Sequence, residues 1–188
     1  MSRTTIAHLF HSLNGVVAEP HLWQFDNFGE EEGLSMNTHL APVTDVIFGT
    51  TLWNEWKDYW PAQDSGDPFA QWVNPIRKHV ISSTLPEDLP WNSTLVTGDP
   101  LEYVRDLRES GDDENDGHIA VAGGITTVRT LFLAGLIDQL TLTTHPVVVG
   151  EGRRLFDESV PTTRLHLLNS SQTSKENMVL TYGLRPEE

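Results

Sequence analysis

The sequence predicts an α/β fold: a mostly parallel sheet with helices on both faces and an antiparallel edge at its C-terminal end. Over the first two thirds of the chain, helical stretches alternate with short apolar strands, a pattern typical of parallel sheets. In the last third, Arg164–Asn169 and Met178–Tyr182 alternate as an antiparallel pair does. We find no internal repeat, low-complexity segment or linker, so residues 1–188 are expected to form a single domain.

The individual elements follow from apolar runs and their breakers. Strands are expected at Thr5–Phe10, Val16–Ala18, Val46–Phe48, His79–Ile81 and Thr94–Thr97. The stretch from Pro20 to Pro42 is expected to be a loop, functional or mobile. After Gly49 a helix carries Trp53, Trp56 and Trp60, and Pro61 stops it. The tryptophan stripe favours core packing over a ring-stacking platform. A second helix is expected over Leu101–Arg108, begun by Asp99 and Pro100.

The most informative stretch is a strand, a glycine pair, a helix and a second strand. Ile119–Ala122 is a short apolar run that ends at Gly123 and Gly124, where the backbone can turn sharply and approach a ligand. Thr126 or Thr127 is expected to cap the next helix, which buries Val128, Leu131 and Phe132 and ends at Gly135. Strand is expected again at Leu140, Leu142 and Val147–Val149.

A strand, a glycine turn and a helix N-terminus together make an anion site, because free amide N–H groups and the helix dipole point at one spot. A dinucleotide pyrophosphate is the usual occupant. The alternative is that the glycines only form a tight turn, and the chain has no full GxGxxG motif. Both interpretations stay open on the residues alone.

Composition excludes several classes of function. The net charge of −15 opposes binding to nucleic acids and anionic membranes, and an anionic cofactor would need local basic groups. Absence of cysteine excludes disulfides and thiolate chemistry and suits a cytoplasmic protein. No apolar run approaches the length of a membrane span, and no signal peptide is evident. His8 and His11 would face opposite sides of a strand, so we expect no metal site.

The chain resembles the bacterial dihydrofolate-reductase-like proteins that share the reductase domain of the riboflavin-biosynthesis deaminase/reductase, the RibD C-terminal domain. The matching pieces occur in family order: SLNGVVA at 12–18, DVIFGTTLWNEW at 45–56, YWP at 59–61, NPIRKHVISSTL at 74–85, STLVTGD at 93–99, HIAVAGG at 118–124, and LFLAGLIDQLTLTTHPVVVGEGRRLF at 131–156. They cover nearly the whole chain, and the last piece is specific to the family.

The resemblance implies a dihydrofolate-reductase-like three-layer α/β/α sandwich, with NADPH (or NADH) over the carboxyl ends of the strands. It also implies a homodimer. Cofactor contacts implied by motif are Val17 and Ala18 at the nicotinamide, Gly49 and Thr50 at the phosphates, Ser82, Ser83 and Thr84 at the adenosine, and Gly123, Gly124, Ile125 and Thr126 at the pyrophosphate. Asn14 and Trp23 are implied at the substrate, and no catalytic residue is assigned.

Three departures from the family pattern matter. Thr50 and Ser83 stand where the family has arginines, and each lost phosphate contact costs about 1.5–3 kcal/mol, or roughly tenfold to a hundredfold in affinity. Asn14 stands where the family commonly has an acid, or simply belongs to an Asn-Gly turn. Basic side chains that could substitute, or be plain surface charges, are Arg77, Lys78 and Arg129, with a smaller chance for Arg153 and Arg154.

The resemblance therefore implies an NAD(P)H-dependent reductase of a small heterocycle, riboflavin-pathway pyrimidine-like or pterin-like, of the 5-amino-6-(5-phosphoribosylamino)uracil reductase type. The alternative is a reductase-fold protein that has lost catalysis and serves as a binding or assembly module. Folate reduction itself is less favoured, because no clear arginine for the folate carboxylate follows the tryptophan helix.

Overall fold

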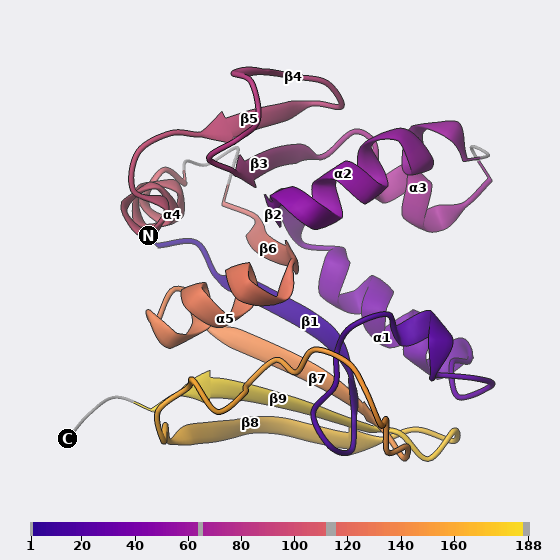
Figure 1. Ribbon diagram of the computed structural model, residues 1–188. Helices are drawn as coiled ribbons and strands as arrows, with labels where there is room; N and C mark the ends of the chain where they lie inside the picture. The colour runs from indigo at the N-terminus through magenta and orange to yellow at the C-terminus, as the bar shows by residue number, and fades with distance from the viewer. Residues whose placement is uncertain (1, 64–65, 112–115, 186–188) are drawn as a thin grey trace.

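The computed structural model describes residues 2–63, 66–111 and 116–185. Its strands form one sheet in the order β4-β5-β3-β2-β6-β1-β7-β9-β8 (Figure 1). The strands are β1 (Thr5–Ser12), β2 (Val43–Gly49), β3 (Arg77–Ile81), β4 (Asp88–Leu89), β5 (Ser93–Val96), β6 (His118–Gly123), β7 (Gln139–His145), β8 (Leu165–Gln172) and β9 (Met178–Leu184). The helices are α1 (Glu30–Leu40), α2 (Thr50–Tyr59), α3 (Pro68–Val73), α4 (Pro100–Glu109) and α5 (Ile125–Leu133).

The strand pairings confirm a mostly parallel sheet with an antiparallel C-terminal edge. The strands β1, β2, β3, β5, β6 and β7 pair in parallel. The last two strands, β8 and β9, pair antiparallel with each other, and β9 pairs antiparallel with β7. The short β4 adds an antiparallel strand at the opposite edge, which the sequence did not indicate.

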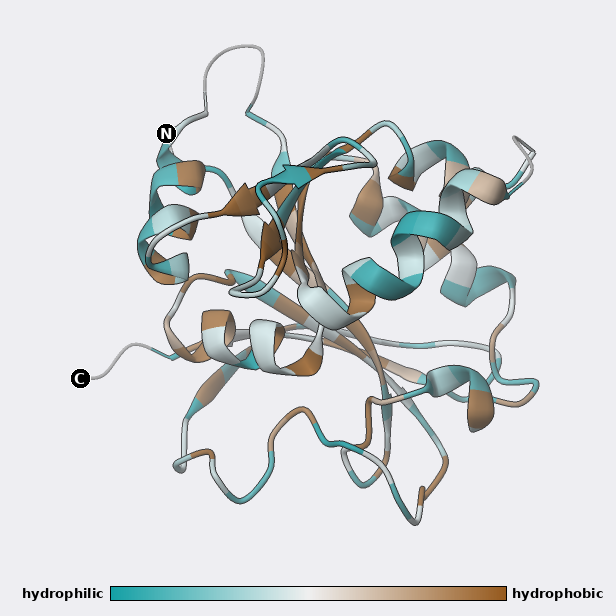
Figure 2. Ribbon diagram, turned by 45° about the horizontal axis from the view of Figure 1, so that its top comes forward, coloured by the Kyte–Doolittle hydropathy of each residue, from teal (hydrophilic) through white to brown (hydrophobic). Residues whose placement is uncertain are grey.

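Helices cover both faces of the sheet, as expected. In Figure 1, α4 and α5 lie to the left of the sheet and α1, α2 and α3 to the right. Alternate residues of one strand enter different cores: Ile119 and Val121 of β6 pack with α4 and α5, whereas Ala120 packs with Trp53 of α2. Figure 2 shows hydrophobic residues along the central strands. Strands buried on both faces read as continuous apolar runs, which is why they were visible in the sequence.

The structure corrects the expectation of a loop from Pro20 to Pro42, because α1 occupies Glu30–Leu40. Its side chains do not repeat with a clear apolar period, so the helix depends on tertiary contacts. The buried carboxylate of Glu32 accepts hydrogen bonds from the Gly29 amide (2.9 Å) and from Nδ2 of Asn177 (2.7 Å). Near the other end, Nε2 of His39 lies 3.1 Å from the hydroxyl of Thr141. Asn177 and Thr141 are each more than a hundred residues from their α1 partners in sequence.

Two expected strands are also wrong. Val147–Val149 is not a strand; it follows Pro146, which has no N–H to donate, and the side chain of Asn14 holds its backbone at Val149. Val16–Ala18 contributes only one isolated bridge, between Val16 and Arg154. The expected helix over Leu101–Arg108 is confirmed as α4, capped by Asp99, whose carboxylate accepts from the amides of Leu101 and Glu102.

Candidate functional site

The centre of the sheet has a topological switch point between β2 and β6. These strands are parallel neighbours, with Phe48 opposite Gly123. From β2 the chain continues through α2 and α3 to β3, toward one edge of the sheet. From β6 it continues through α5 to β7, toward the opposite edge. Because α2 and α5 leave on opposite faces, a crevice opens outside the carboxyl ends of these strands, where open α/β sheets bind their ligands.

A cavity of about 1080 Å³ occupies this crevice, at the upper end of the range for small-molecule sites. Residues that line it come from β1, from α1, α2 and α3, from the ends of β3 and β6, and from the start of α5. Residues from both hydrophobic cores line it.

Glycines bring the backbone close together at the head of this cavity. A Cβ on Gly49 would lie 2.7 Å from Oγ1 of Thr127 and 3.1 Å from the amide nitrogen of Gly124, and a Cβ on Gly123 would lie 2.8 Å from Leu52. A Cβ on Gly124 would meet no atom within 4 Å, because the space beside this residue is open. The peptide bond between Gly123 and Gly124 is cis. The close approach at Gly49 and Gly123 therefore needs glycine.

Two helix N-termini begin at these glycines. Gly49 is the N-cap of α2 and Gly124 is the N-cap of α5, and neither helix has a side-chain cap. The expectation that Thr126 or Thr127 caps α5 is therefore wrong: both lie within its first turn, and Oγ1 of Thr126 instead accepts from Arg153 at 3.2 Å. The first amide N–H groups of a helix have no intrahelical acceptor. Both helices thus present free donors and their positive dipole ends to the cavity.

The cavity brings together most of the residues implied at the cofactor. Those that line it are Val17, Ala18, Gly49, Thr50, Gly123, Gly124, Ile125 and Thr126. Ser82, Ser83 and Thr84 do not line it. Ser82 directly follows Ile81, which does, but its hydroxyl accepts from the amides of Thr84 and Leu85 in its own turn. Ser83 and Thr84 are exposed.

Asn14 and Trp23, implied at the substrate, lie outside the lining. The amide side chain of Asn14 donates to the carbonyl of Val149 at 2.8 Å and accepts from the amide of the same residue at 3.0 Å. Trp23 is buried, its indole N–H donates to the carbonyl of Ala18, and its ring packs edge-on against His145. Both side chains hold neighbouring loops together in the structure.

The basic residues suggested as substitutes for the missing arginines have other partners. Arg77 pairs with Asp45 at 2.9 Å, and Arg129 pairs with Asp157 at 2.6 Å. Lys78 is buried over the ring of Trp91, where desolvation lowers its pKa to about 8. Among the described lysines and arginines, the one that lines the cavity is Arg153, which follows β7 in the chain and donates to Thr126 at the start of α5. Arg154 donates to the carbonyl of Asn14 and does not line the cavity.

Two histidines that the sequence did not assign to the site, His8 and His39, line the cavity. The rings of His8 and His39 lie 5.3 Å apart, and Nε2 of His8 lies 2.8 Å from the hydroxyl of Thr143. Burial, with a smaller effect from His39, lowers the pKa of His8 to about 3, so its imidazole is neutral at physiological pH. Nδ1 of His39 donates to the carbonyl of Ser35 at 2.8 Å, which fixes the ring. His39 was hidden because it belongs to the unpredicted α1.

Aromatic side chains form another part of the wall. We name Trp56, Trp60, Phe69 and Trp72 the aromatic subsite; they line the cavity and contact one another at centroid distances of 4.6–5.7 Å. The predicted tryptophan stripe is therefore divided. Trp53 is a core residue whose indole N–H donates to Ser93, as expected, whereas Trp56 and Trp60 face the cavity. Phe69 and Trp72 come from α3, a short helix that the sequence did not indicate.

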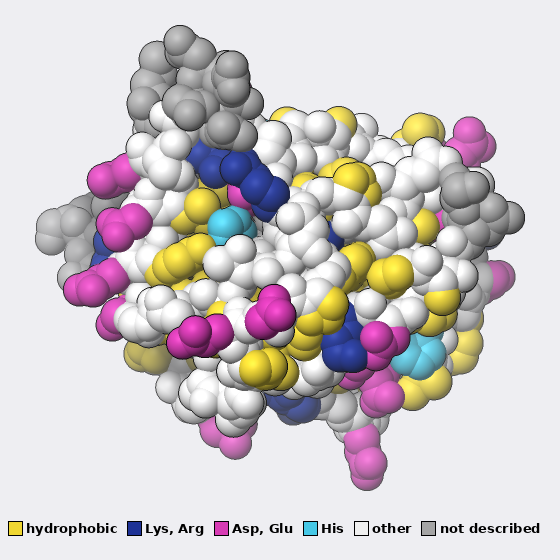
Figure 3. All heavy atoms as spheres, turned by 90° about the horizontal axis from the view of Figure 1, so that it is seen from above, with side chains coloured by type: hydrophobic (Ala, Val, Ile, Leu, Met, Phe, Trp, Pro, Cys, Tyr) yellow, Lys and Arg dark blue, Asp and Glu magenta, His cyan; other side chains and the backbone are white. Residues whose placement is uncertain are grey.

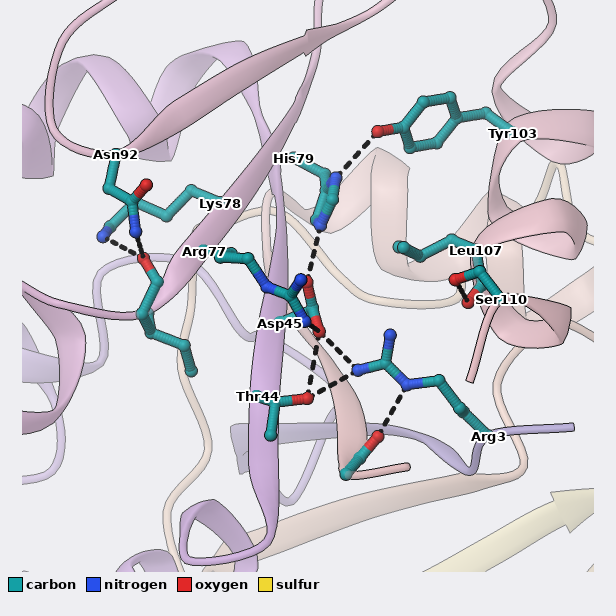
Figure 4. A network of polar contacts seen from close by, with 12 residues as sticks. Arg3, Thr44, Asp45, Arg77, Lys78, His79, Asn92, Tyr103, Leu107 and Ser110 are labelled. Atoms are coloured by element: carbon teal, nitrogen blue, oxygen red, sulfur yellow. Dashed lines mark hydrogen bonds and ion pairs between the residues drawn. The ribbon is translucent and has the colours of Figure 1, made fainter. Parts of the chain in front are cut away.

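A second polar cluster lies at the opposite, amino end of the central strands (Figure 4). The carboxylate of Asp45 is buried and bonds to Arg3, Arg77, His79 and Thr44. Burial alone would raise the pKa of Asp45, but hydrogen bonds from His79 and Arg3 and the charge of Arg3 hold it well below its usual range. None of these five residues lines the cavity.

Among the described residues, no group of three or more His, Cys, Asp or Glu side chains is placed to hold a metal ion. In the same residues, none of the helices has the length and apolar character that crossing a bilayer requires.

Comparison with known proteins identifies the family. Residues 3–180 match the model of the RibD C-terminal domain, so the chain belongs to that family and the resemblance is confirmed. It is 26% identical over 146 residues to the uncharacterized protein YyaP of Bacillus subtilis (strain 168), covering 76% of this chain and 75% of YyaP.

Solved structures show the same fold. A putative riboflavin biosynthesis protein from Shewanella sp. PV-4 superposes with a TM-score of 0.71 at 19% identity, covering 99% of this chain and 100% of the other. Dihydrofolate reductase from Enterococcus faecalis, in complex with NADP(H), superposes with a TM-score of 0.59 at 14% identity, covering 99% and 100%. The dihydrofolate-reductase-like fold class predicted from the sequence is thus confirmed.

Proposed function

We propose that the protein is an NAD(P)H-dependent reductase of a small heterocyclic substrate with a reducible C=N or C=O group. The observation that carries this proposal is the meeting of two helix N-termini without side-chain caps, those of α2 and α5, at the neighbouring Gly49 and Gly124 beside a cavity of about 1080 Å³. Family membership supports reductase chemistry. A diphosphate suits this arrangement, because free amides and two dipole ends can bind it where the family arginines are missing.

When bound, the nicotinamide cofactor supplies the hydride. The groups of the protein itself bind the cofactor and orient it toward the substrate. Amides at the starts of α2 and α5 hold the diphosphate, and Arg153 adds positive charge beside Thr126. Val17 and Ala18 flank the nicotinamide by family motif, and the apolar walls exclude water. His8 is a neutral hydrogen-bonding group there, and the proton reaches the substrate from another cavity residue or from water.

Cofactor binding tests the proposal directly. Titration with NADPH and with NADH should quench tryptophan fluorescence saturably, because Trp56 and Trp60 line the cavity. Arg153→Gln should weaken binding about tenfold to a hundredfold. Arg105→Gln is the matched control, since Arg105 is exposed on α4 and does not line the cavity. Absence of binding by either nucleotide at millimolar concentrations would refute the reductase proposal.

The alternative, a reductase fold that has lost catalysis, is favoured by one observation. Arg77, Lys78 and Arg129 all have partners elsewhere, so Arg153 is the single Lys or Arg in the described cavity lining. The double variant Thr50→Arg with Ser83→Arg distinguishes the two ideas. Recovery of nucleotide binding from an undetectable level would indicate a decayed site, whereas saturable binding by the unaltered protein would favour the reductase.

A further inference from the structure

The charge of the cavity lining restricts the substrate. The chain has 12 lysines and arginines, all within the described ranges. Arg153 alone among them lines the cavity, and it donates to the hydroxyl of Thr126 at the start of α5. On the face shown in Figure 3, acidic side chains are spread widely, whereas Lys and Arg gather at a few places. The acids Glu19 and Glu55 also line the cavity.

The aromatic subsite is built from other elements than those that hold that arginine. Trp56 and Trp60 come from α2 and the turn after it, Phe69 and Trp72 come from α3, and Glu55 precedes Trp56 in α2. A phosphate or carboxylate seated here would meet aromatic walls and the carboxylate of Glu55. Arg153, the single Lys or Arg in the described lining, is bonded to Thr126 of α5 and not to a residue of α2 or α3, so it does not replace the lost hydration. An anion is therefore disfavoured by both repulsion and desolvation.

The same subsite has donors without acceptors. The indole Nε1 atoms of Trp60 and Trp72 are buried and have no hydrogen-bond partner in the part of the chain that the structure describes. An indole nitrogen is a donor only, and buried polar groups normally have partners. A planar ring with carbonyl or ring-nitrogen acceptors would stack on these aromatic faces, and it would accept from these N–H groups once the rings shift to uncover them.

We infer that the substrate carries an uncharged planar heterocycle, without phosphate or carboxylate, that occupies the aromatic subsite. The inference rests on the proposed reductase function and names the substrate class of its site. It disfavours both the phosphorylated pyrimidine of the namesake riboflavin reaction and a folate with its carboxylate tail. The acidic residue that sets this preference is Glu55.

Two probes that differ in one charge test the inference: pterin and pterin-6-carboxylate, titrated by calorimetry with and without NADPH. Pterin should bind about tenfold tighter or more, which corresponds to about 1.4 kcal/mol of discrimination. Glu55→Lys should narrow or reverse the preference. Glu109→Lys, which changes the net charge equally on exposed α4, should leave it unchanged.

Removal of the unpaired donors is an independent measurement. Trp60→Phe and Trp72→Phe keep an aromatic ring but lose the indole N–H, and each should weaken pterin binding by about tenfold. Trp53→Phe is the control, because Trp53 is buried against Ser93 and does not line the cavity. It should lower stability while pterin affinity is retained.

The outcomes separate the two proposals. Equal or tighter binding of the carboxylate, no saturable binding of pterin at millimolar concentrations, or equal effects of Glu55→Lys and Glu109→Lys would overturn the inference. Failure of NADPH to bind while pterin binds with the expected preference would refute the reductase function and leave the substrate class standing. If NADPH binds but pterin and pterin-6-carboxylate bind equally well, the substrate class is refuted and the reductase function stands.

Discussion

Asp45 and His79 lie on neighbouring parallel strands, and Oδ1 of Asp45 is 2.9 Å from Nε2 of His79. The other ring nitrogen, Nδ1, lies 2.8 Å from the hydroxyl of Tyr103 on α4. Burial, together with the charge of Asp45, raises the pKa of Tyr103, so its hydroxyl keeps its proton. Asp45 thus joins β2, β3 and α4, and through Arg3 it also joins the N-terminal segment.

Asp45→Asn should destabilise the protein by about 3–5 kcal/mol, because it leaves the buried guanidinium of Arg3 without a counter-charge. Urea unfolding followed by circular dichroism measures the change. Asp58→Asn is the control, since the carboxylate of Asp58 is 80% exposed in its pair with Lys57, and it should cost at most about 1 kcal/mol. Equal effects would contradict the role of the buried network.

The pH dependence of stability should also change at Asp45. Its pKa is depressed in the folded protein, so its contribution is complete above the unfolded pKa of about 3.9. The contribution is lost as the pH falls from there toward the lower folded value. Wild type should therefore lose stability more steeply than Asp45→Asn below about pH 4. Parallel acid-unfolding curves would show that this carboxylate is not specially stabilised.

His8 should make stability pH-dependent in a different range. Its folded pKa is about 3, below the unfolded value of about 6.5, so between these values the unfolded chain binds the extra proton. Stability should fall as the pH drops through this window, by up to about 1.4 kcal/mol per pH unit. His8→Asn should flatten this dependence, and His166→Asn, at an exposed position on β8, should not. Urea unfolding at a series of pH values measures both slopes.

Two glycines predict opposite effects of the same substitution. A Cβ on Gly117 would lie 2.3 Å from Cγ2 of Thr44 and 2.9 Å from the carbonyl of Pro42, so Gly117→Ala should destabilise by about 1–3 kcal/mol. A Cβ on Gly33, inside α1, would meet nothing within 4 Å. Gly33→Ala should stabilise by about 0.5–1 kcal/mol. Thermal unfolding gives both signs, and a loss of stability on Gly33→Ala would contradict the placement of α1.

Much of the sheet was predictable because its strands are buried on both faces. The runs at Val46–Phe48 and Ile119–Ala122 became β2 and β6 with small changes of boundary. Their glycines indicated the helix starts correctly, although the caps are Gly49 and Gly124 themselves. A short apolar run bounded by glycine is formed by consecutive residues, so it can be recognised from the sequence alone.

The elements that were missed depend on distant contacts. Helix α1 is positioned by Asn177 and Thr141, and no local apolar period marks it. The aromatic subsite combines Trp56 and Trp60 with residues of α3, whose position could not be read from spacing. Asn14 illustrates the limit of motif transfer: its amide holds the loop at Val149, a contact that a substrate role did not anticipate.

The helices that start at Gly49 and Gly124 belong to different hydrophobic layers, α2 to one and α5 to the other. A ligand that binds the N-termini of both helices links the two hydrophobic cores, which are otherwise connected through the sheet between them. Occupancy should therefore raise the melting temperature in proportion to the logarithm of ligand concentration. Binding should also slow amide hydrogen exchange in α2 and in α5 at the same ligand concentrations, because both helices contact the same ligand.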